Sequence, residues 1–218
     1  MFAMQAAIFD LDGVIVDTAK YHFQAWRRLA AELGFELEPE VNELLKGVSR
    51  QRSLEIVLEA GGVAADHNQE ARLRMAERKN RWYVELVSGM DAGEILPGAL
   101  ECLGACRAGG VQTALGTASR NASLILDRLG IRGCFDVVVD GESVSRPKPD
   151  PEVFLVASRR LGVAAAFCAV FEDAVAGVEA AKRAGMYAVG IGRPEILSAA
   201  DEVIPGLDRF RALSLRFA

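Results

Sequence analysis

The spacing of apolar residues changes once along the chain, near residue 95. Between residues 18 and 94 they recur every three or four positions, as at Tyr21, Ala25, Leu29 and Leu33, which is the period of amphipathic helices. No alternating run typical of a strand interrupts this segment. The pattern predicts helices over residues 18–33, 39–46, 51–60 and 68–87.

Outside that segment, short apolar runs rich in β-branched residues alternate with helical runs. Strands are expected at residues 5–9, 111–116, 135–139, 167–171 and 186–191, with helices at 97–107, 119–129, 151–161 and 174–184. This alternation predicts an α/β fold with a doubly wound parallel sheet, which binds ligands at the carboxyl ends of its strands. We expect residues 1–18 and 95–218 to form the catalytic core, and residues 19–94 to form an inserted helical cap that covers the site as a lid.

Composition and charge narrow the class of partner. The chain has 218 residues, 51% hydrophobic and 25% charged, which suits a globular protein with a full core. Its formal net charge of −5 argues against nucleic acid or an anionic membrane as the main partner. No apolar run reaches the ~20 residues of a membrane span and no signal peptide is recognisable, so a cytoplasmic protein is expected. Nothing in the sequence calls for more than a monomer. The cysteines are interpreted as reduced thiols in the core: Cys102, Cys106, Cys134 and Cys168.

Two aspartates follow the first predicted strand. Asp10 and Asp12 come directly after residues 5–9, and Gly13 allows the chain to turn sharply. Because side chains alternate along a strand, we expect both carboxylates on one side of its carboxyl end. Carboxylates this close need a divalent cation or a shared proton. A metal-bound carboxylate beside a protonatable one can attack a phosphoryl group and then manage the protons, which indicates an enzyme.

Three further polar groups follow other predicted strands. The run from Thr117 to Asn121 offers hydroxyls and backbone N–H groups at a helix start, where phosphate binds, although Ser119 could simply cap that helix. Lys148 stands in a proline-rich turn that either aims it at the site or exposes it at the surface. The pair Glu172-Asp173 supplies metal ligands or stabilises a helix N-terminus. Chance would not place all of these at one sheet edge, so together they predict a phosphoryl-transfer site.

The order Asp-Leu-Asp-Gly-Val, then a hydroxyl, then a lysine among prolines, then Glu-Asp resembles the haloacid dehalogenase (HAD) superfamily of phosphotransferases. Further runs are similar to its β-phosphoglucomutase family over nearly the whole chain. These runs are residues 10–18, 21–26, 46–50, 78–80, 118–121 and 190–195. The resemblance implies a HAD-like Rossmannoid core with a cap. It also implies interconversion of β-D-glucose 1-phosphate and glucose 6-phosphate through β-glucose 1,6-bisphosphate, which is intermediate and activator.

The same resemblance implies a role for each site residue. Asp10 would be the nucleophile that becomes an aspartyl-phosphate, and Asp12 the general acid and base. Thr117 and Lys148 would offset charge on the transferring phosphoryl group. The cofactor would be Mg²⁺, held by Asp10, Asp12, Glu172 and Asp173. The sugar phosphate would contact Thr18, His22, Trp26, Gly47, Val48, Ser49, Arg50, Lys79, Ala118, Ser119, Arg120 and Asn121.

Some of these residues also have simpler interpretations. Arg50 is the candidate for the second phosphate seat that a reorienting bisphosphate needs, because guanidinium can bind phosphate through two hydrogen bonds. Taken alone, it would be a solvated arginine, His22 a partly exposed helix histidine and Trp26 part of the cap core. The chain also departs from the family, since Thr117 stands where many relatives carry serine and Arg146-Pro147 resembles superfamily phosphatases more than the mutase.

The nearest alternative function is a sugar-phosphate phosphatase on the same fold, in which water rather than sugar accepts the phosphoryl group. His22, the loop 47–50 and Lys79 favour the mutase. A catalytically silent sugar-phosphate regulator is disfavoured because the acidic residues and Lys148 are all retained. A nucleotide-binding dehydrogenase is disfavoured because no Gly-x-Gly-x-x-Gly follows the first strand.

Overall fold

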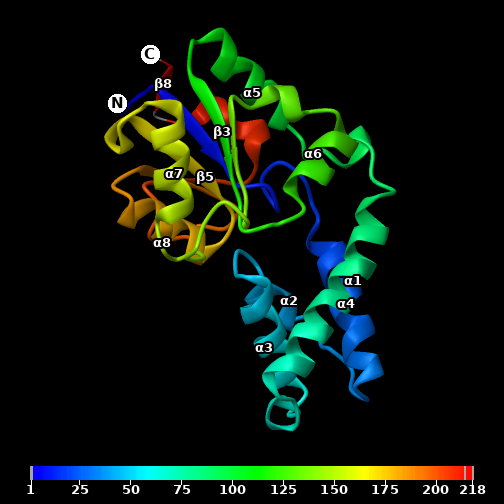
Figure 1. The fold of residues 1–218 in the computed structure, drawn as a ribbon. Helices are drawn as coiled ribbons and strands as arrows, with labels where there is room; N and C mark the ends of the chain where they lie inside the picture. Colours follow the sequence, from blue (N-terminus) through cyan, green and yellow to red (C-terminus); the bar gives the residue numbers. More distant parts are fainter. Residues whose placement is uncertain (1, 214, 218) are drawn as a thin grey trace.

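The computed structural model describes residues 2–213 and 215–217, and a six-stranded sheet forms the centre of the fold (Figure 1). All of its strands are parallel, in the order β4-β3-β2-β5-β6-β7. This confirms the predicted doubly wound sheet. The strands are β2 (Ala6–Phe9), β3 (Gln112–Gly116), β4 (Val137–Val139), β5 (Cys168–Glu172), β6 (Tyr187–Ile191) and β7 (Glu202–Ile204).

Helices cover both faces of the sheet, because successive side chains of a strand point to opposite sides. Phe9 and Phe171 pack with α5 (Ala99–Ala108) and α6 (Ala122–Leu129) on one face. Ile8 and Val170 pack with α7 (Glu152–Leu161) and α8 (Val175–Arg183) on the other. Strands buried on both faces explain the nearly continuous apolar runs in the sequence.

Most of the segment between β2 and α5 folds into a separate helical body with its own core, drawn below the sheet in Figure 1. Its two longest helices, α1 (Ala19–Glu32) and α4 (Gln69–Val87), pack side by side. Trp26, Leu29 and Leu58 are almost completely buried at its centre. We refer to this body as the cap, and it also contains α2 (Val41–Leu44), α3 (Arg50–Ala60) and the 3-10 helix η1 (Ala64–Asp66).

Several boundaries differ from the sequence expectation for local reasons. The helix expected from residue 97 begins at Ala99, because Gly98 adopts a left-handed φ of +81°. The helix expected from residue 119 begins at Ala122, since the Thr117 hydroxyl accepts the Ser119 N–H in a turn that precedes it. Asn121, not Ser119, is therefore the N-cap residue of α6, so the simpler interpretation of Ser119 as the cap of that helix does not hold.

Short elements near the chain ends were not predicted. β7 extends the sheet at its edge, and β1 (Phe2–Met4) pairs in parallel with β8 (Leu215–Phe217) in a separate two-stranded sheet. Each has only three residues, too few to show a period. The described residues contain four further 3-10 helices: η2 (Ala92–Glu94), η3 (Arg132–Cys134), η4 (Ala165–Phe167) and η5 (Leu207–Ala212). Within the described residues, no helix is both long enough and apolar enough to cross a membrane.

Two stacked phenylalanines join the central strands directly below the predicted site. Phe9 and Phe171 are buried, and their rings stack with centroids 4.6 Å apart. Phe9→Ala should therefore lower the free energy of unfolding by about 3–5 kcal/mol, measured by denaturant titration. Phe167→Ala is the control, because that ring is 44% exposed and its loss should cost much less. Equal losses would contradict this assignment of the core.

Candidate active site

Asp10 and Asp12 lie in a tight loop at the carboxyl end of β2. The strand ends at Phe9, so the loop, rather than the alternation of a strand, brings the two residues together. The Asp12 backbone N–H donates to Asp10 Oδ2 at 2.9 Å. Gly13 has a φ of +78°, and a Cβ atom there would lie 2.2 Å from Asp173 Oδ2. Only glycine therefore lets the loop pass this close to the next acidic residue.

Lys148 bridges two buried carboxylates. Its Nζ lies 2.5 Å from Asp10 Oδ1 and 2.7 Å from Glu172 Oε2, and all three side chains are almost completely buried. Despite the opposing effect of burial, the two carboxylates raise the pKa of Lys148 above its usual value. Lys148 thus remains a cation. The proline-rich turn directs its side chain into the site rather than to the surface, which is the first of the two interpretations of the sequence.

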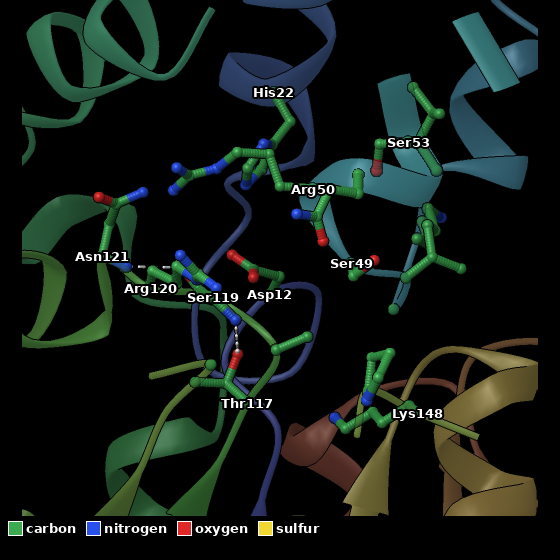
Figure 2. A pocket seen from close by; sticks show the side chains of 18 of the residues that line it. Asp12, His22, Ser49, Arg50, Ser53, Thr117, Ser119, Arg120, Asn121 and Lys148 are labelled. Carbon is green, nitrogen blue, oxygen red and sulfur yellow. Dashed lines mark hydrogen bonds between the residues drawn. The ribbon is translucent and has the colours of Figure 1, made fainter. Parts of the chain in front are cut away.

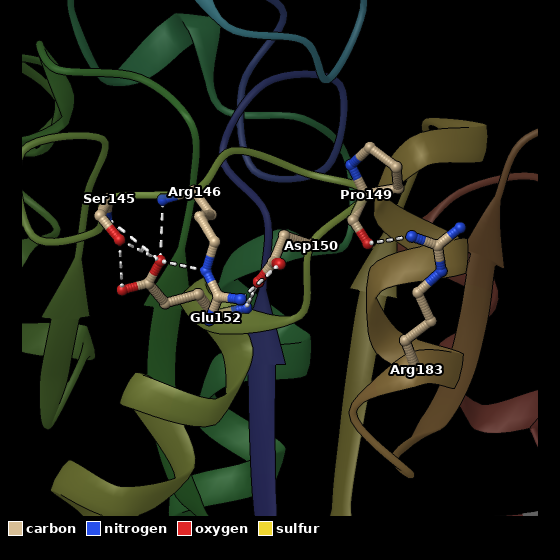
Figure 3. A network of polar contacts seen from close by, with 6 residues as sticks. All are labelled: Ser145, Arg146, Pro149, Asp150, Glu152 and Arg183. Atoms are coloured by element: carbon tan, nitrogen blue, oxygen red, sulfur yellow. Dashed lines mark hydrogen bonds and ion pairs between the residues drawn. The ribbon is translucent and has the colours of Figure 1, made fainter.

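The loop that carries Lys148 is held from outside the site (Figure 3). Glu152, at the start of α7, accepts hydrogen bonds from the backbone N–H groups of Ser145 and Arg146 at 3.2 and 2.8 Å. On the other flank, Arg183 of α8 donates to the Pro149 carbonyl at 3.4 Å. Contacts to two helices therefore fix both ends of the turn, and this limits the positions that Lys148 can take.

Three acidic side chains meet where a metal ion could bind. Asp10, Glu172 and Asp173 each offer a carboxylate oxygen, and these oxygens lie within 4.8 Å of one another. Burial and the neighbouring Glu172 and Asp10 carboxylates raise the pKa of Asp173 well above its usual value. A set of hard oxygen donors suits Mg²⁺, and these residues fit that ion.

Asp12 is set up to carry a proton near neutral pH. Burial, and secondly the Asp10 carboxylate, raise the pKa of Asp12 to about 7. The Thr18 hydroxyl donates a hydrogen bond to Asp12 Oδ1, which acts in the opposite direction. An acid whose pKa lies near the working pH can both give and take a proton efficiently.

A cavity of about 290 Å³ joins this acidic end to the cap. Most of the predicted site residues line it. From the cap these are His22, Trp26, Gly47, Val48, Ser49, Arg50 and Lys79, and from the core Asp10, Asp12, Thr117, Ala118, Ser119, Arg120, Asn121, Lys148 and Asp173.

Two predicted residues do not line the cavity. Thr18, predicted to contact substrate, is fully buried and directs its hydroxyl to Asp12. Glu172, predicted as a metal ligand, lies behind the surface of the cavity. It binds Lys148 and accepts the Ala174 N–H at 3.1 Å while remaining part of the acidic cluster. Burial, partly offset by Lys148, raises the pKa of Glu172 to about 7.

The half-buried His22 and the buried Lys79 form a close pair on the cap side of the cavity. Lys79 Nζ lies 2.7 Å from His22 Nδ1, and the His22 ring stacks on Tyr83 with centroids 3.9 Å apart. Lys79 also lies over the Trp26 ring, 4.4 Å from its centroid. Burial lowers the pKa of both His22 and Lys79 well below their usual values. His22 is half-buried, as its simpler interpretation expected, but it lines the cavity, and Trp26 both packs in the cap core and reaches the cavity.

Arginines from the cap and the core meet at the far end of the cavity. Figure 2 shows Arg50, at the start of α3, reaching from the cap toward Arg120 and Asn121 of the core. Burial, together with the charge of Arg120, lowers the pKa of Arg50 from its usual value. Two cations held this close favour an anion between them, and guanidinium groups bind phosphate well.

Sequence analysis did not single out every residue of the cavity. Leu73, Ala76, Glu77 and Asn80 line it along one side of α4. Their spacing of three and four residues is the helical period, so this face could have been found once Lys79 was suspected. Lys46 lines the cavity as well, and its charge counters the rise in the Asp173 pKa.

Known proteins similar to this chain point to one family. The haloacid dehalogenase-like hydrolase family matches residues 4–185. "Beta-phosphoglucomutase" of Bacillus subtilis is 42% identical over 92% of this chain and 89% of its own. "Phosphorylated carbohydrates phosphatase" of Thermotoga maritima is 37% identical over 84% of this chain and 82% of its own. A crystal structure of beta-phosphoglucomutase from Clostridium difficile superposes with a TM-score of 0.90 at 40% identity, covering 94% of this chain and 92% of the other.

The raised pKa of Asp12 predicts how stability of the metal-free protein depends on pH. Between the unfolded pKa of about 4 and the folded value, the folded state binds more protons, so stability falls as pH rises through that range. Asp12→Asn should remove on the order of 2 kcal/mol of this dependence between about pH 5 and pH 8. Denaturant titration across that range measures it. An unchanged slope in the variant would contradict the raised pKa.

A matched pair of glycines tests the position of Glu172. A Cβ atom at Gly177 would lie 2.0 Å from Glu172 Cδ, so Gly177→Ala must displace the carboxylate that holds Lys148. We expect catalytic turnover to fall on the order of 10²-fold. Gly104→Ala in α5 meets nothing within 4 Å and should slightly stabilise the protein without loss of turnover. Full activity in Gly177→Ala would show that this contact does not matter.

Proposed function

We infer the function of this chain from its family, because the chain belongs to the haloacid dehalogenase-like hydrolase family. We propose that it is a β-phosphoglucomutase, an isomerase that interconverts β-D-glucose 1-phosphate and glucose 6-phosphate. The relative from Bacillus subtilis, 42% identical over 92% of this chain, supports this activity within the family. The intermediate would be β-glucose 1,6-bisphosphate, which also serves as activator.

One structural observation carries the proposal. The cavity has two ends that favour phosphate: the Asp10 and Lys148 end in the core, and the Arg50 and Arg120 end between cap and core. A phosphatase acting on a monophosphate needs only the first. A sugar with phosphate groups at both ends needs both seats, and a volume of about 290 Å³ suits a small ligand of this kind.

The residues at the acidic end can perform phosphoryl transfer. Asp10 attacks the phosphoryl group to form an aspartyl-phosphate. A hydroxyl of the bound sugar phosphate later attacks the phosphorus of that aspartyl-phosphate. Asp12, whose pKa is about 7, gives a proton to the leaving oxygen in one direction and removes it from the attacking hydroxyl in the other. Lys148 offsets the negative charge of the transferring group, and the Thr117 hydroxyl contributes a polar contact.

Asp10 and Asp173 would hold Mg²⁺ with the Asp12 main-chain carbonyl, and Glu172 would support them. When bound, the ion would neutralise negative charge on the transferring phosphoryl group. Glu172 has a second task that the structure makes plain, since it accepts a hydrogen bond from Lys148 at 2.7 Å and so keeps that cation in place.

The cap would bind the sugar and the second phosphate and would exclude water while it is closed. Lys79 and His22 would contact the sugar from α4 and α1, and Arg50 would hold the distal phosphate with Ser119, Arg120 and Asn121. We propose accordingly that residues 19–94 act as a mobile cap on the core formed by 1–18 and 95–218. The monomeric state and cytoplasmic location stay predictions.

A sugar-phosphate phosphatase is the second candidate. The relative named for that activity in Thermotoga maritima is 37% identical over 84% of this chain. Both activities pass through the same phosphoenzyme and differ in whether sugar or water accepts the phosphoryl group. Each tenfold change in that partition corresponds to only about 1.4 kcal/mol, so a few cap residues decide between them.

A paired assay distinguishes the two candidates. With Mg²⁺, β-glucose 1-phosphate and a trace of the bisphosphate, we expect glucose 6-phosphate with little free phosphate, and no product from the α-anomer. Asp10→Asn should lower turnover by on the order of 10³-fold or more, since it removes the nucleophile. Coupled dehydrogenase and phosphate detection in one tube measure both products. Free phosphate without glucose 6-phosphate would favour the phosphatase.

Arg50→Ala tests the distal seat. Because Arg50 lies at the cap end, away from the phosphoryl acceptor Asp10, its loss should lower mutase flux by roughly 10- to 100-fold. Hydrolysis of acetyl phosphate, which has only one phosphate group and no sugar, should change far less. Comparable losses in both assays would show that Arg50 does not bind the distal phosphate.

A further inference from the structure

A pair of asparagine side chains connects the cap to the core across the cavity. Asn121 Nδ2 donates to Asn80 Oδ1 at 3.0 Å, joining the turn before α6 to the middle of α4. Contacts beside the two linkers aside, this is the one side-chain hydrogen bond between cap and core within residues 2–213 and 215–217. Both residues also line the cavity.

The Asn121 side chain does not cap the helix that it precedes. It is the N-cap residue of α6, and asparagine is among the best N-cap residues because its side chain can accept a backbone N–H of the first turn. Here the Asn121 side chain makes no such bond. Its carboxamide is directed to Asn80 instead, so the side chain bonds to the cap rather than to its own helix.

The contact fixes the carboxamide beside the two cations of the distal end. Figure 2 shows the Asn121 amide group directed toward the Arg50 guanidinium, with Arg120 close by. A carboxamide has two N–H donors in one plane, and Asn80 takes one of them. The second N–H is thereby held in a defined direction, available to an anion bound between the arginines.

We propose that Asn80 is a positioning residue for the doubly phosphorylated ligand, an inference that rests on the proposed function. Asn80 orients the Asn121 carboxamide toward the distal phosphate and does so only while α4 lies against the core. The bond therefore couples retention of the bisphosphate to cap closure. A ligand with one phosphate, seated at Asp10, gains nothing from it.

Binding and turnover test the proposal separately. In an Asp10→Asn background with Mg²⁺, where no phosphoenzyme forms, Asn80→Ala should weaken the affinity for glucose 1,6-bisphosphate by on the order of three- to tenfold, measured by calorimetry. With Asp10 intact, the same change should leave acetyl phosphate hydrolysis within about twofold of the parent. Glu85→Ala, on the exposed side of α4, is the matched control and should change neither.

A double-mutant cycle shows whether Asn80 acts through Asn121. If it does, Asn80→Ala combined with Asn121→Ala should weaken bisphosphate binding no more than Asn121→Ala alone. Additive losses, or an equal loss of acetyl phosphate hydrolysis, would overturn the proposal. If the protein with Asn80 binds the bisphosphate and Asn80→Ala does not weaken that binding, only the inference about Asn80 is overturned. If the protein with Asn80 does not bind the bisphosphate at all, the proposed function is overturned and this inference with it.

Discussion

The arrangement of this site depends on placing three carboxylates at one edge of a sheet. Asp10, Glu172 and Asp173 repel one another, and burial makes that repulsion costly. Lys148, in the loop between β4 and α7, offsets this repulsion. Its Nζ lies 2.5 Å from Asp10 Oδ1 and 2.7 Å from Glu172 Oε2. Neighbouring residues stabilise this arrangement, because Glu152 and Arg183 form hydrogen bonds with the turn that carries Lys148. The acids stay crowded together because a buried cation stays between two of them, which leaves Asp173 open to the cavity.

Like charges also repel at the far end of the cavity, where the charges are positive. Arg50 and Arg120 approach each other, and burial together with the charge of Arg120 disfavours the charge on Arg50. An anion bound at that end would relieve this repulsion between cap and core. The polar residues between the ends, Lys79 and His22, have their pKa values lowered by burial. The far end of the cavity thus suits a negatively charged group of the ligand.

Sequence reasoning reached the sheet, the inserted helices and most residues of the cavity. It succeeded where a period is long, as in α1 and α4, and where charged residues follow buried strands. It failed where a single local contact decides the outcome. The start of α6 depends on a hydrogen bond from Ser119 to Thr117, and the burial of Thr18 and Glu172 behind the cavity depends on their partners Asp12 and Lys148. The meeting of Asn80 with Asn121 joins segments that no local pattern connects.

The position of β2 in the sheet has a consequence for how the chain is made. β2 lies at the centre, where Ala6 pairs with Gln112 on one side and with Cys168 on the other. During synthesis the central strand is made before the cap, whereas both of its neighbours in the sheet follow only after the whole cap. The cap helices have a core of local contacts and can form meanwhile, whereas the apolar strand at the N-terminus must wait unpaired. The nascent chain therefore keeps the apolar strand that precedes Asp10 unpaired until β3 has been made, and such an exposed segment is a target for chaperones.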